Sequence, residues 1–352
     1  MGRFRKFAAS ILAMAISFSL AACSSGSNSS SSSSSSSSTS TSGSSSVSAS
    51  TSAERRQIGI IQLMDHPALN AAHDGFVDAL EEMGYKDGEN ITIVYQNGQG
   101  DTNNLSTIAD KFVGDKVDLV LAIATPAAQA VAGKTTEIPI IATAVTDFAE
   151  AGLVESNEKP NTNVSGTNDM NPIDAQIDLM LQLCPDVKTV GFLYNSSEDN
   201  SRLQVDLAKK ILDEKNIKYV ERTVASTNDV QQATTSIVTE CDVIYLPTDN
   251  VFASSMPIVS DITVASKTPV ICGESGMVEG GGLATLGINY YNIGHQAGLM
   301  ALRVLDQGAN IAEMPVESST DYDFCINGPV AEAIGITIPD ELKEFIITPA
   351  ES

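Results

Sequence analysis

Several short polar loops in this sequence hold residues that could bind a small charged molecule. Thr125, Pro126 and Ala127 follow an apolar run and open a helical segment. The free backbone N–H groups and the dipole at a helix start favour a carboxylate, and the Thr125 hydroxyl would add a donor. The alternative is that Thr125 only caps the helix. Asp147 and Asp249 also follow apolar runs, and each could receive an ammonium group or serve as an ordinary cap or turn residue.

Further candidates for ligand contact lie in similar loops. Tyr290 and the adjacent Tyr291 could stack on a flat side chain or cover it, or could pack at a joint between two parts of the fold. His66 follows the first apolar run and is expected near the same pocket. The complete set of predicted ligand-binding residues is His66, Thr125, Pro126, Ala127, Thr146, Asp147, Asn168, Tyr194, Asp249, Asn250, Glu274, Ser275 and Tyr290. A site that accepts both a carboxylate and an amine suits an amino-acid-like ligand.

Motifs for catalysis, metals and cofactors do not occur in the sequence. We find no G-x-S-x-G elbow, no Walker loop of the form G-x-x-x-x-G-K-S/T and no H-E-x-x-H pair. The three histidines lack metal-ligand spacing. Glycines 280–282 lack the G-x-G-x-x-G spacing, so we interpret them as a loop. We therefore expect a protein that is not an enzyme, with no catalytic residue, no metal and no cofactor.

Four cysteines follow the N-terminal segment, and none forms a C-x-x-C pair. Cys184, Cys241, Cys272 and Cys325 are scattered, and three of them lie in apolar strand-like runs. Outside a cell they could form disulfides. Isolated strand cysteines are more often small buried hydrophobes, and this is the interpretation that we favour.

The elements that must position the loops alternate regularly along the chain. Continuous apolar runs at 57–63, 117–124 and 138–145 are typical of strands covered on both faces, and apolar residues at spacings of three and four between them indicate helices. Residues 161–171, rich in Asn, Thr and Gly, break this rhythm, and a second series begins at 174. The repetition implies right-handed β-α-β units. We predict an α/β fold of two doubly wound parallel-sheet lobes joined by a hinge.

Two such lobes would bring the candidate loops together. In open α/β sheets, ligands bind beyond the carboxyl ends of the parallel strands. The loops expected there are 64–66, 125–127 and 146–147 in the first lobe, and 194–195, 248–250 and 274–276 in the second. A ligand between the lobes could touch both sets.

The N-terminal residues have the pattern of a secretory signal. Basic residues precede an apolar run at 7–18, and Leu20-Ala21-Ala22-Cys23 looks like a bacterial lipobox, in which Cys23 is lipidated after residues 1–22 are removed. The alternatives are an ordinary signal peptide with an incidental cysteine, or a membrane-spanning anchor, for which the run is too short. Residues 24–52 are almost all serine, threonine, glycine and asparagine, so we expect residues 23–53 to form a lipidated, disordered tether.

The remaining chain is long enough for a two-lobed domain. About 300 of the 352 residues follow the tether, which is enough for a sizeable core. The net charge of −24 argues against nucleic acid as a partner. It suits a soluble domain exposed outside a cell.

Several segments between Gln57 and Glu344 resemble the tryptophan/tyrosine-type family of ABC transporter substrate-binding lipoproteins. They are IGIIQLMDHPALNAAHDGFVDAL, LVLAIATPAAQA, TDFAEAGLV, GTNDM, VGFLYNSSEDNS, LPTDNVFASSM and GINYYNIGHQAG. The resemblance implies a type I periplasmic-binding-protein fold with three crossovers, near 167–168, 286–289 and 315–319. The first lobe would hold 54–167 and about 288–316, and the second 168–287 and about 317–346. Because Asp249 lies in one of these segments, it is the better candidate for the ammonium.

The leading hypothesis is capture of a small molecule, with an amino acid first and an aromatic one favoured. The partners would be a separately encoded ABC permease and ATPase and, through the lipid, the extracytoplasmic face of the cell membrane; we expect a monomer that binds no nucleic acid. The alternatives are a ligand-sensing lipoprotein that signals to a membrane receptor, a binding protein for nucleosides or sugars, and an enzyme on a doubly wound fold. Fold alone does not separate these functions.

Overall fold

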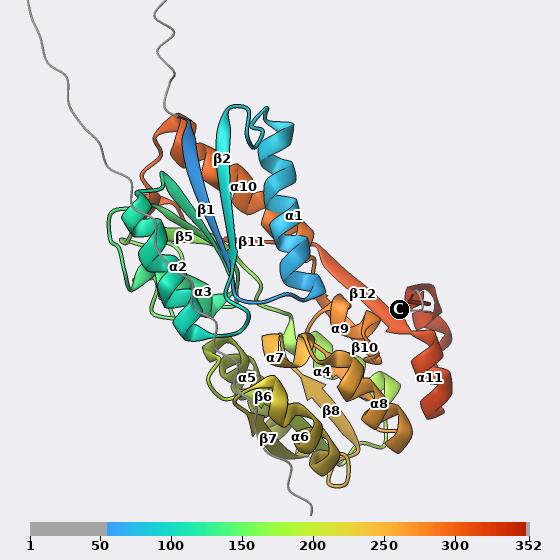
Figure 1. The fold of residues 1–352 in the computed structure, drawn as a ribbon. Helices are drawn as coiled ribbons and strands as arrows, with labels where there is room; N and C mark the ends of the chain where they lie inside the picture. The colour runs from blue at the N-terminus through green and yellow to red at the C-terminus, as the bar shows by residue number, and fades with distance from the viewer. Residues whose placement is uncertain (1–54, 350–352) are drawn as a thin grey trace, which may run out of the picture. The chain divides into compact units, whose positions relative to one another are not determined.

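The computed structural model describes residues 55–349, and helices and strands alternate through most of this range (Figure 1). The predictions for the signal segment, Cys23 and the serine-rich tether lie outside the described residues. The first part of the chain forms β1 (Arg56–Gln62), α1 (Pro67–Glu82), β2 (Ile91–Asn97), α2 (Thr102–Asp115), β3 (Leu119–Ile123), α3 (Thr125–Ala132), β4 (Ile140–Val145) and β5 (Val164–Asn168).

A second series of elements follows. It comprises α4 (Ile173–Leu183), β6 (Thr189–Asn195), α5 (Asp199–Glu214), β7 (Lys218–Val224), α6 (Val230–Ile237), β8 (Val243–Leu246), α7 (Asn250–Ala253), α8 (Met256–Ser266), β9 (Val270–Cys272), α9 (Ser275–Glu279) and β10 (Ala284–Ile288). The chain ends with α10 (Tyr290–Gln307), β11 (Glu317–Ser318), β12 (Tyr322–Asn327), α11 (Gly328–Ile334) and β13 (Ile346–Ile347). The repeated α/β layout confirms the predicted fold class.

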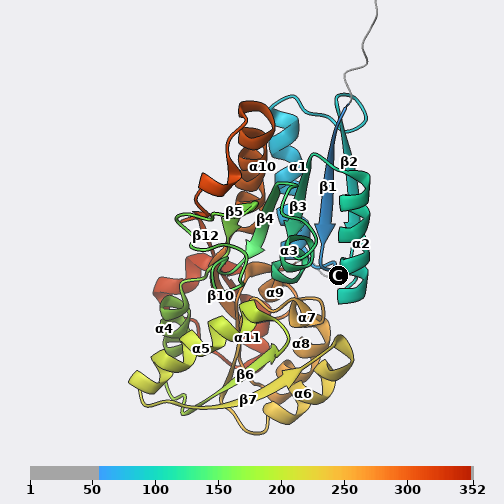
Figure 2. The same cartoon turned by 90° about the vertical axis from the view of Figure 1, so that its left-hand side faces the viewer.

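The strands form two sheets, one in each lobe (Figure 2). The first sheet has the order β11-β5-β4-β3-β1-β2, and every pair in it is parallel. The second has the order β13-β12-β10-β9-β8-β6-β7 and is parallel except for β10 and β12, which run antiparallel. The second sheet is therefore mixed, whereas the sequence predicted parallel sheets in both lobes.

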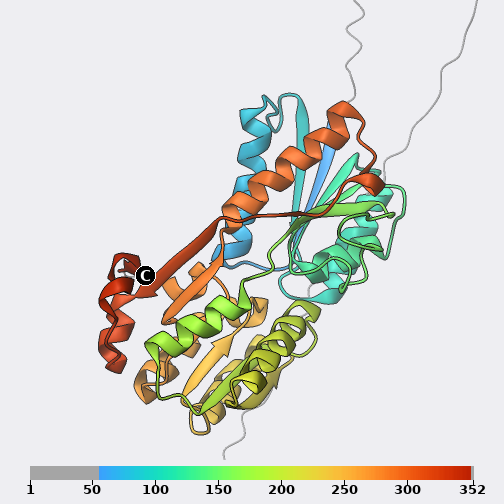
Figure 3. The same cartoon turned by 180° about the vertical axis from the view of Figure 1, so that it is seen from behind.

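The chain passes between the two sheets three times (Figure 3). It leaves the first sheet after β5, returns between β10 and α10, and leaves again between β11 and β12. Residues 317–318 pair with β5 in the first sheet, so the last crossing occupies 319–321. Three connections at one side of a two-lobed fold give the geometry of a hinge.

Helices cover both faces of the first sheet, with α1 and α10 on one face and α2 and α3 on the other (Figure 1). The contact between α1 and α10 depends on glycine. A Cβ at Gly294 would lie 2.0 Å from the Ala72 carbonyl oxygen, and one at Gly75 would lie 2.1 Å from the Tyr291 carbonyl oxygen. The two helix backbones can therefore approach only because these positions lack side chains.

Two groups of elements differ from expectation. The segment 161–171 contains β5, whose polar residues Ser165 and Thr167 are fully buried. Their hydroxyls donate to Met314 O at 2.8 Å and to Ile293 O at 3.0 Å, so burial does not require an apolar pattern here. The loops 248–250 and 274–276 begin the short helices α7 and α9.

The four cysteines within residues 55–349 are free, as the sequence analysis favoured. Cys184, Cys272 and Cys325 are buried and Cys241 is partly buried. Within residues 55–349, none of the helices combines the length and the apolar character needed to span a bilayer.

Candidate functional site

A cavity lies between the carboxyl ends of the two sheets and is lined by residues of both lobes. The residues that line it are His66, Leu69, Ala144, Asp169, Asn200, Thr248, Asp249, Asn250, Ala253, Glu274, Met277 and Tyr290. The space that they enclose is large enough for only about one water molecule. A ligand larger than a water molecule must therefore enter while the two lobes are further apart than in this structure.

The charged side chains in the lining of this cavity are all acidic, and the other polar residues there are His66, Asn200, Thr248, Asn250 and Tyr290. Asp169, Asp249 and Glu274 are each at most 3 % exposed, and no Lys or Arg is among the described residues that line the cavity. Burial raises the pKa of all three carboxyl groups, that of Glu274 to about 7. An isolated buried charge is costly, so the cavity favours a ligand with a positive group or several hydrogen-bond donors.

Asp249 lines the cavity, and its carboxylate also performs the capping role that the sequence left open. Oδ1 accepts from Phe252 N at 3.0 Å and so caps α7. Oδ2 accepts from Asn195 N at 2.6 Å and from Ser201 Oγ at 2.8 Å. Asp249 therefore ties the end of β6 to the starts of α5 and α7, and most of its acceptor capacity is used by the protein.

Asp169 follows β5 and joins a network that crosses between the lobes. Its carboxylate accepts from Thr146 Oγ1 at 3.0 Å and from the Tyr290 hydroxyl. Gln204, on α5, donates to Thr146 Oγ1 at 3.3 Å and to Thr248 Oγ1 at 2.5 Å. Thr146 thus does not line the cavity itself, but it contacts the lining residue Asp169 and links it to Gln204 of the second lobe.

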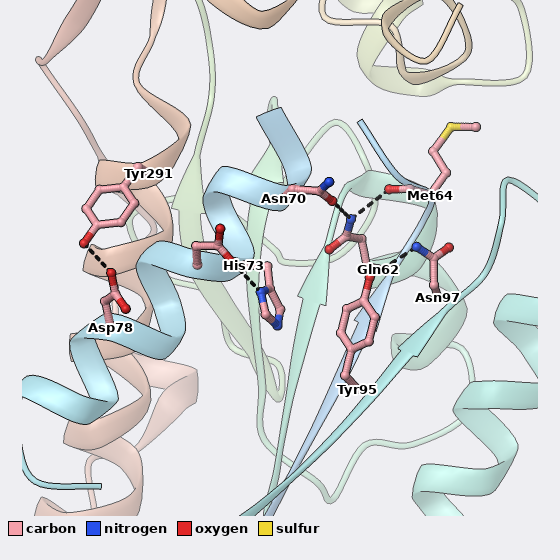
Figure 4. A network of polar contacts seen from close by, with 9 residues as sticks. Gln62, Met64, Asn70, His73, Asp78, Tyr95, Asn97 and Tyr291 are labelled. Atoms are coloured by element: carbon pink, nitrogen blue, oxygen red, sulfur yellow. Dashed lines mark hydrogen bonds and ion pairs between the residues drawn. The ribbon is translucent and has the colours of Figure 1, made fainter. Parts of the chain in front are cut away.

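A second link between the lobes runs through His66. Its Nε2 lies 3.0 Å from Asn250 Oδ1, and its Nδ1 is buried without a hydrogen-bond partner. Burial lowers the pKa of His66 to about 4, so the ring is neutral at pH 7. The loop that carries His66 is held by Gln62, whose Nε2 donates to Met64 O at 2.9 Å and to Asn70 Oδ1 at 2.7 Å (Figure 4).

Thr125 lies at the first position of α3, beside the main cavity. With Asp147, Asp199, Asn200 and other residues it lines a smaller neighbouring cavity, and Asn200 lines both. Thr125 is 2 % exposed, and its buried hydroxyl has no hydrogen-bond partner among the described residues. The preceding Ala124 has a φ of 86°, a strained conformation of the kind found at ligand sites.

Glu274 and Ser275 begin α9. Glu274 accepts from Gly276 N at 2.5 Å and Met277 N at 2.9 Å, and it lines the cavity. Ser275 instead donates to Asp323 Oδ2 at 3.1 Å, outside the main cavity.

Eight predicted residues do not line the main cavity: Thr125, Thr146 and Ser275, which are described above, and five others. Ala127 is fully buried in the core of the first lobe, and the half-buried Asp147 accepts from Ala149 N at 2.9 Å as a turn residue. Tyr194 donates to Glu221 on β7 at 2.8 Å. Pro126 lies in the first turn of α3, and Asn168 ends β5. Asp147, Asn168 and Tyr194 lie at or near strand ends as expected, and Pro126 and Ala127 lie at a helix start, but none of the five side chains belongs to the cavity wall.

The two adjacent tyrosines take different directions. Tyr290 is 6 % exposed and faces the cavity. Tyr291 is 38 % exposed, and its hydroxyl donates to Asp78 on α1 at 2.8 Å (Figure 4). The sequence analysis left two roles open for these tyrosines. Tyr290 lines the cavity, and Tyr291 packs against α1 near the hinge.

Sequence reasoning missed several lining residues. Asp169, Asn200, Leu69, Ala253 and Met277 were not predicted. Asp169 directly follows the predicted residue Asn168, and Asn200 lies soon after the end of β6, so a wider window around the predicted residues could have found both. Leu69, Ala253 and Met277 lie in helices, where an apolar residue gives no signal that distinguishes a ligand contact from core packing.

Two α/β lobes around a cavity lined from both sides define a two-lobed ligand-binding protein. Residues 57–346 match the family model described as ABC transporter substrate binding protein, and the chain belongs to this family. Its function is accordingly that of a substrate-binding protein of an ABC transporter.

Relatives with known names and structures extend this comparison. The chain is 46% identical over 283 residues to a protein of Clostridioides difficile (strain R20291) named Tyrosine-binding protein, covering 80% of this chain and 82% of the relative. It is 38% identical to an ABC domain from Streptococcus pneumonia solved in complex with L-Trp, with a TM-score of 0.80 over 83% of this chain and 100% of that one.

A third relative was solved without ligand. It is a substrate binding protein with adhesive properties from Clostridium difficile in its ligand-free, open structure, 46% identical, with a TM-score of 0.65 over 84% of this chain and 100% of that one. The chain therefore superposes better on the L-Trp complex than on the open relative, although its sequence is more similar to the latter.

Proposed function

We propose that the cavity binds an aromatic amino acid and that the lobes close around it. The observation that carries this proposal is the composition of the cavity wall: the apolar side chains of Leu69, Ala253 and Met277 together with three buried carboxyl groups. An apolar wall suits a large side chain, and the acidic groups suit an ammonium. The proposal is supported by the relatives, one named as tyrosine-binding and one solved with L-Trp.

The carboxylate of the ligand would lie at the start of α3. Thr125 offers a buried hydroxyl without a partner, and the helix start offers backbone N–H groups. The ammonium would lie on the acidic side, near Asp169 and Asn200. Because the ligand would bridge residues of both lobes, it would bind the closed arrangement more tightly than the open one.

Binding, rather than catalysis, is the activity that we propose. The ligand would be delivered to an ABC permease driven by a separately encoded ATPase. A screen of the purified protein by thermal shift against amino acids, nucleosides and sugars tests the ligand class. At 100 times its Kd, an aromatic amino acid should stabilise the protein by about 2.7 kcal/mol. A shift with a sugar or nucleoside and none with amino acids would reject the proposal.

We also propose that the chain is a monomer held on the extracytoplasmic face of the cell membrane by a lipid on Cys23. The support is the Leu-Ala-Ala-Cys motif after a basic and apolar N-terminal segment. The Cys23→Ala variant should be released from membranes or remain unprocessed. A variant that is cleaved after residue 22 and still sediments with membranes would show that the lipid is not the anchor.

A further inference from the structure

Glu198 carries a buried carboxylate that does not line the cavity. It precedes α5 and is 3 % exposed, and its side chain does not cap that helix. Its Oε2 accepts from Asn200 Nδ2 at 3.1 Å, from Asn250 Nδ2 at 2.5 Å and from Asn250 N at 3.3 Å. Three N–H groups converge on one oxygen, so this oxygen is an acceptor whether or not the carboxyl group carries a proton.

These contacts determine which way the two amide side chains point. The Nδ2 of Asn200 also donates to Thr248 O at 3.0 Å, so two oxygen acceptors hold its NH₂ group on the side away from the ligand. Its Oδ1 is buried, has no partner, and belongs to a residue that lines the cavity. A reversed amide would place Oδ1 against two oxygens, which is unfavourable.

The orientation of Asn250 in turn determines the tautomer of His66. Because Asn250 Nδ2 faces Glu198, its Oδ1 faces His66 Nε2 at 3.0 Å. An oxygen acceptor requires Nε2 to carry the proton in the neutral ring. Nδ1 is then a lone-pair acceptor, and it is buried without a partner.

We propose that Glu198 is a positioning residue that presents two hydrogen-bond acceptors to the cavity, and that these acceptors select ligands with an amino group. Through the two asparagines it presents Asn200 Oδ1 and His66 Nδ1 as unpaired acceptors. Unpaired buried acceptors are costly, and an ammonium group with three N–H donors satisfies them. A ligand of the same shape without the amine leaves them unpaired. The selection of an amine-bearing ligand rests on the proposed function, whereas the assignment of the His66 tautomer does not.

The tautomer is tested first, in the ligand-free protein at pH 7. Long-range ¹H–¹⁵N NMR distinguishes protonated from unprotonated ring nitrogens, and the chain has only three histidines to assign. Wild type should show His66 protonated at Nε2 alone. Glu198→Met, which removes the acceptor at similar volume, should yield a mixture of tautomers. Glu198→Gln, which keeps one carbonyl oxygen, should restore the wild-type signals.

Ligand selectivity is tested second, by calorimetry with L-tyrosine and 3-(4-hydroxyphenyl)propionate, the same molecule without its amine. Wild type should prefer L-tyrosine at least tenfold. Glu198→Met should lower this preference about tenfold or abolish it, and Glu198→Gln should keep it within threefold. Glu221→Met is the control, because Glu221 binds Tyr194 and Lys209 outside the cavity; it should leave the preference unchanged.

The possible outcomes separate this inference from the proposed function. A wild-type His66 protonated at Nδ1, or a folded Glu198→Met protein with unchanged tautomer and preference, would overturn the inference. If Glu198→Met does not fold, Asn250→Ala removes the same link and should give the same mixture of tautomers; an unchanged tautomer there is equally decisive against it. If the wild-type protein binds no aromatic amino acid, the proposed function is wrong, and so is the proposed selection of ligands by Glu198. The tautomer measurement still decides whether Glu198 orients Asn250 and His66.

Discussion

Three buried polar atoms beside the cavity have no partner within the described chain: Thr125 Oγ1, His66 Nδ1 and Asn200 Oδ1. A buried polar group without a hydrogen bond costs roughly 1–3 kcal/mol. A ligand that supplies partners would recover this cost on binding, so the atoms that weaken the empty protein are also the ones that would strengthen the complex. The single-residue predictions follow from this property.

The Thr125 hydroxyl gives the first prediction. Thr125→Val removes an unpartnered hydroxyl at nearly constant volume, so the free energy of unfolding of the empty protein should stay equal or rise. The affinity for an aromatic amino acid should fall about tenfold or more, because a hydrogen bond to a charged group is lost.

Calorimetric titration and urea denaturation measure the two effects. Thr234→Val is the matched control, since Thr234 Oγ1 is also buried and unpartnered but lies on α6, outside the cavity. It should have a similar effect on stability and none on binding. Equal affinities for Thr125→Val and wild type would exclude Thr125 from the site.

His66 gives a prediction about pH. Its pKa is about 4 in the folded protein and 6.5 in an unfolded chain, so the unfolded state binds the proton first as the pH falls. The stability contributed by neutral His66 is therefore complete above about pH 6.5 and is lost between pH 6.5 and 4. At pH 4.5 the loss should be about 2–3 kcal/mol.

The comparison with His66→Gln isolates this effect. The raised pKa values of Glu198, about 8, and Glu274, about 7, act in the opposite direction, because they reduce stability as the pH rises above about 4.5. Both proteins share these groups, so the difference between their unfolding free energies should shrink on going from pH 7 to pH 4.5. A constant difference would mean that His66 is not buried as a neutral ring.

The roles of single residues were only partly predictable from sequence. The location of Thr125 at a helix start follows from the apolar run before it and Pro126 after it. The role of Asp249 does not, because a loop aspartate can cap, turn or bind, and only the contacts with Phe252 and Asn195 show how much of its carboxylate is already used. Asp169 was missed since it follows a strand without an apolar pattern.

At the scale of the elements, periodicity predicted strands and helices wherever burial is apolar. It missed β5, whose buried Ser165 and Thr167 are satisfied by hydrogen bonds from other parts of the chain. It also missed α7 and α9, each too short to show a helical period. The residues that cap these two helices, Asp249 and Glu274, line the cavity, so the local signal is weakest where the site is built.

The packing of α10 on α1 gives the prediction at this scale. Gly294→Ala would place a Cβ 2.0 Å from the Ala72 carbonyl oxygen, so the helices must separate. We expect a loss of about 1–3 kcal/mol in unfolding free energy. Gly114→Ala on α2 is the control, because a Cβ there meets nothing within 4 Å.

The control should raise stability by roughly 0.5–1 kcal/mol, as expected for alanine in place of glycine in a helix. Chemical denaturation compares the two variants with wild type. Effects of the same sign would show that α1 and α10 are not in close contact in solution.

At the scale of the whole molecule, the repetition of strands and helices predicted two lobes, and the order of the strands confirmed two sheets. The sequence could not show how polar residues of the two lobes meet. The contact of His66 with Asn250 and that of Thr146 with Gln204 join positions far apart in the chain, and no local pattern encodes them. These contacts require the lobes to be close together, the arrangement that a bridging ligand would stabilise.

Calorimetric titration of the purified protein with L-tyrosine and L-tryptophan tests the central claim most directly. The account predicts saturable binding of at least one of them at one site per chain, with a Kd in the micromolar range or below and a negative heat-capacity change from burial of the aromatic ring. If neither L-tyrosine nor L-tryptophan produces binding heat at any temperature tested, the result contradicts the claim that this cavity binds an aromatic amino acid.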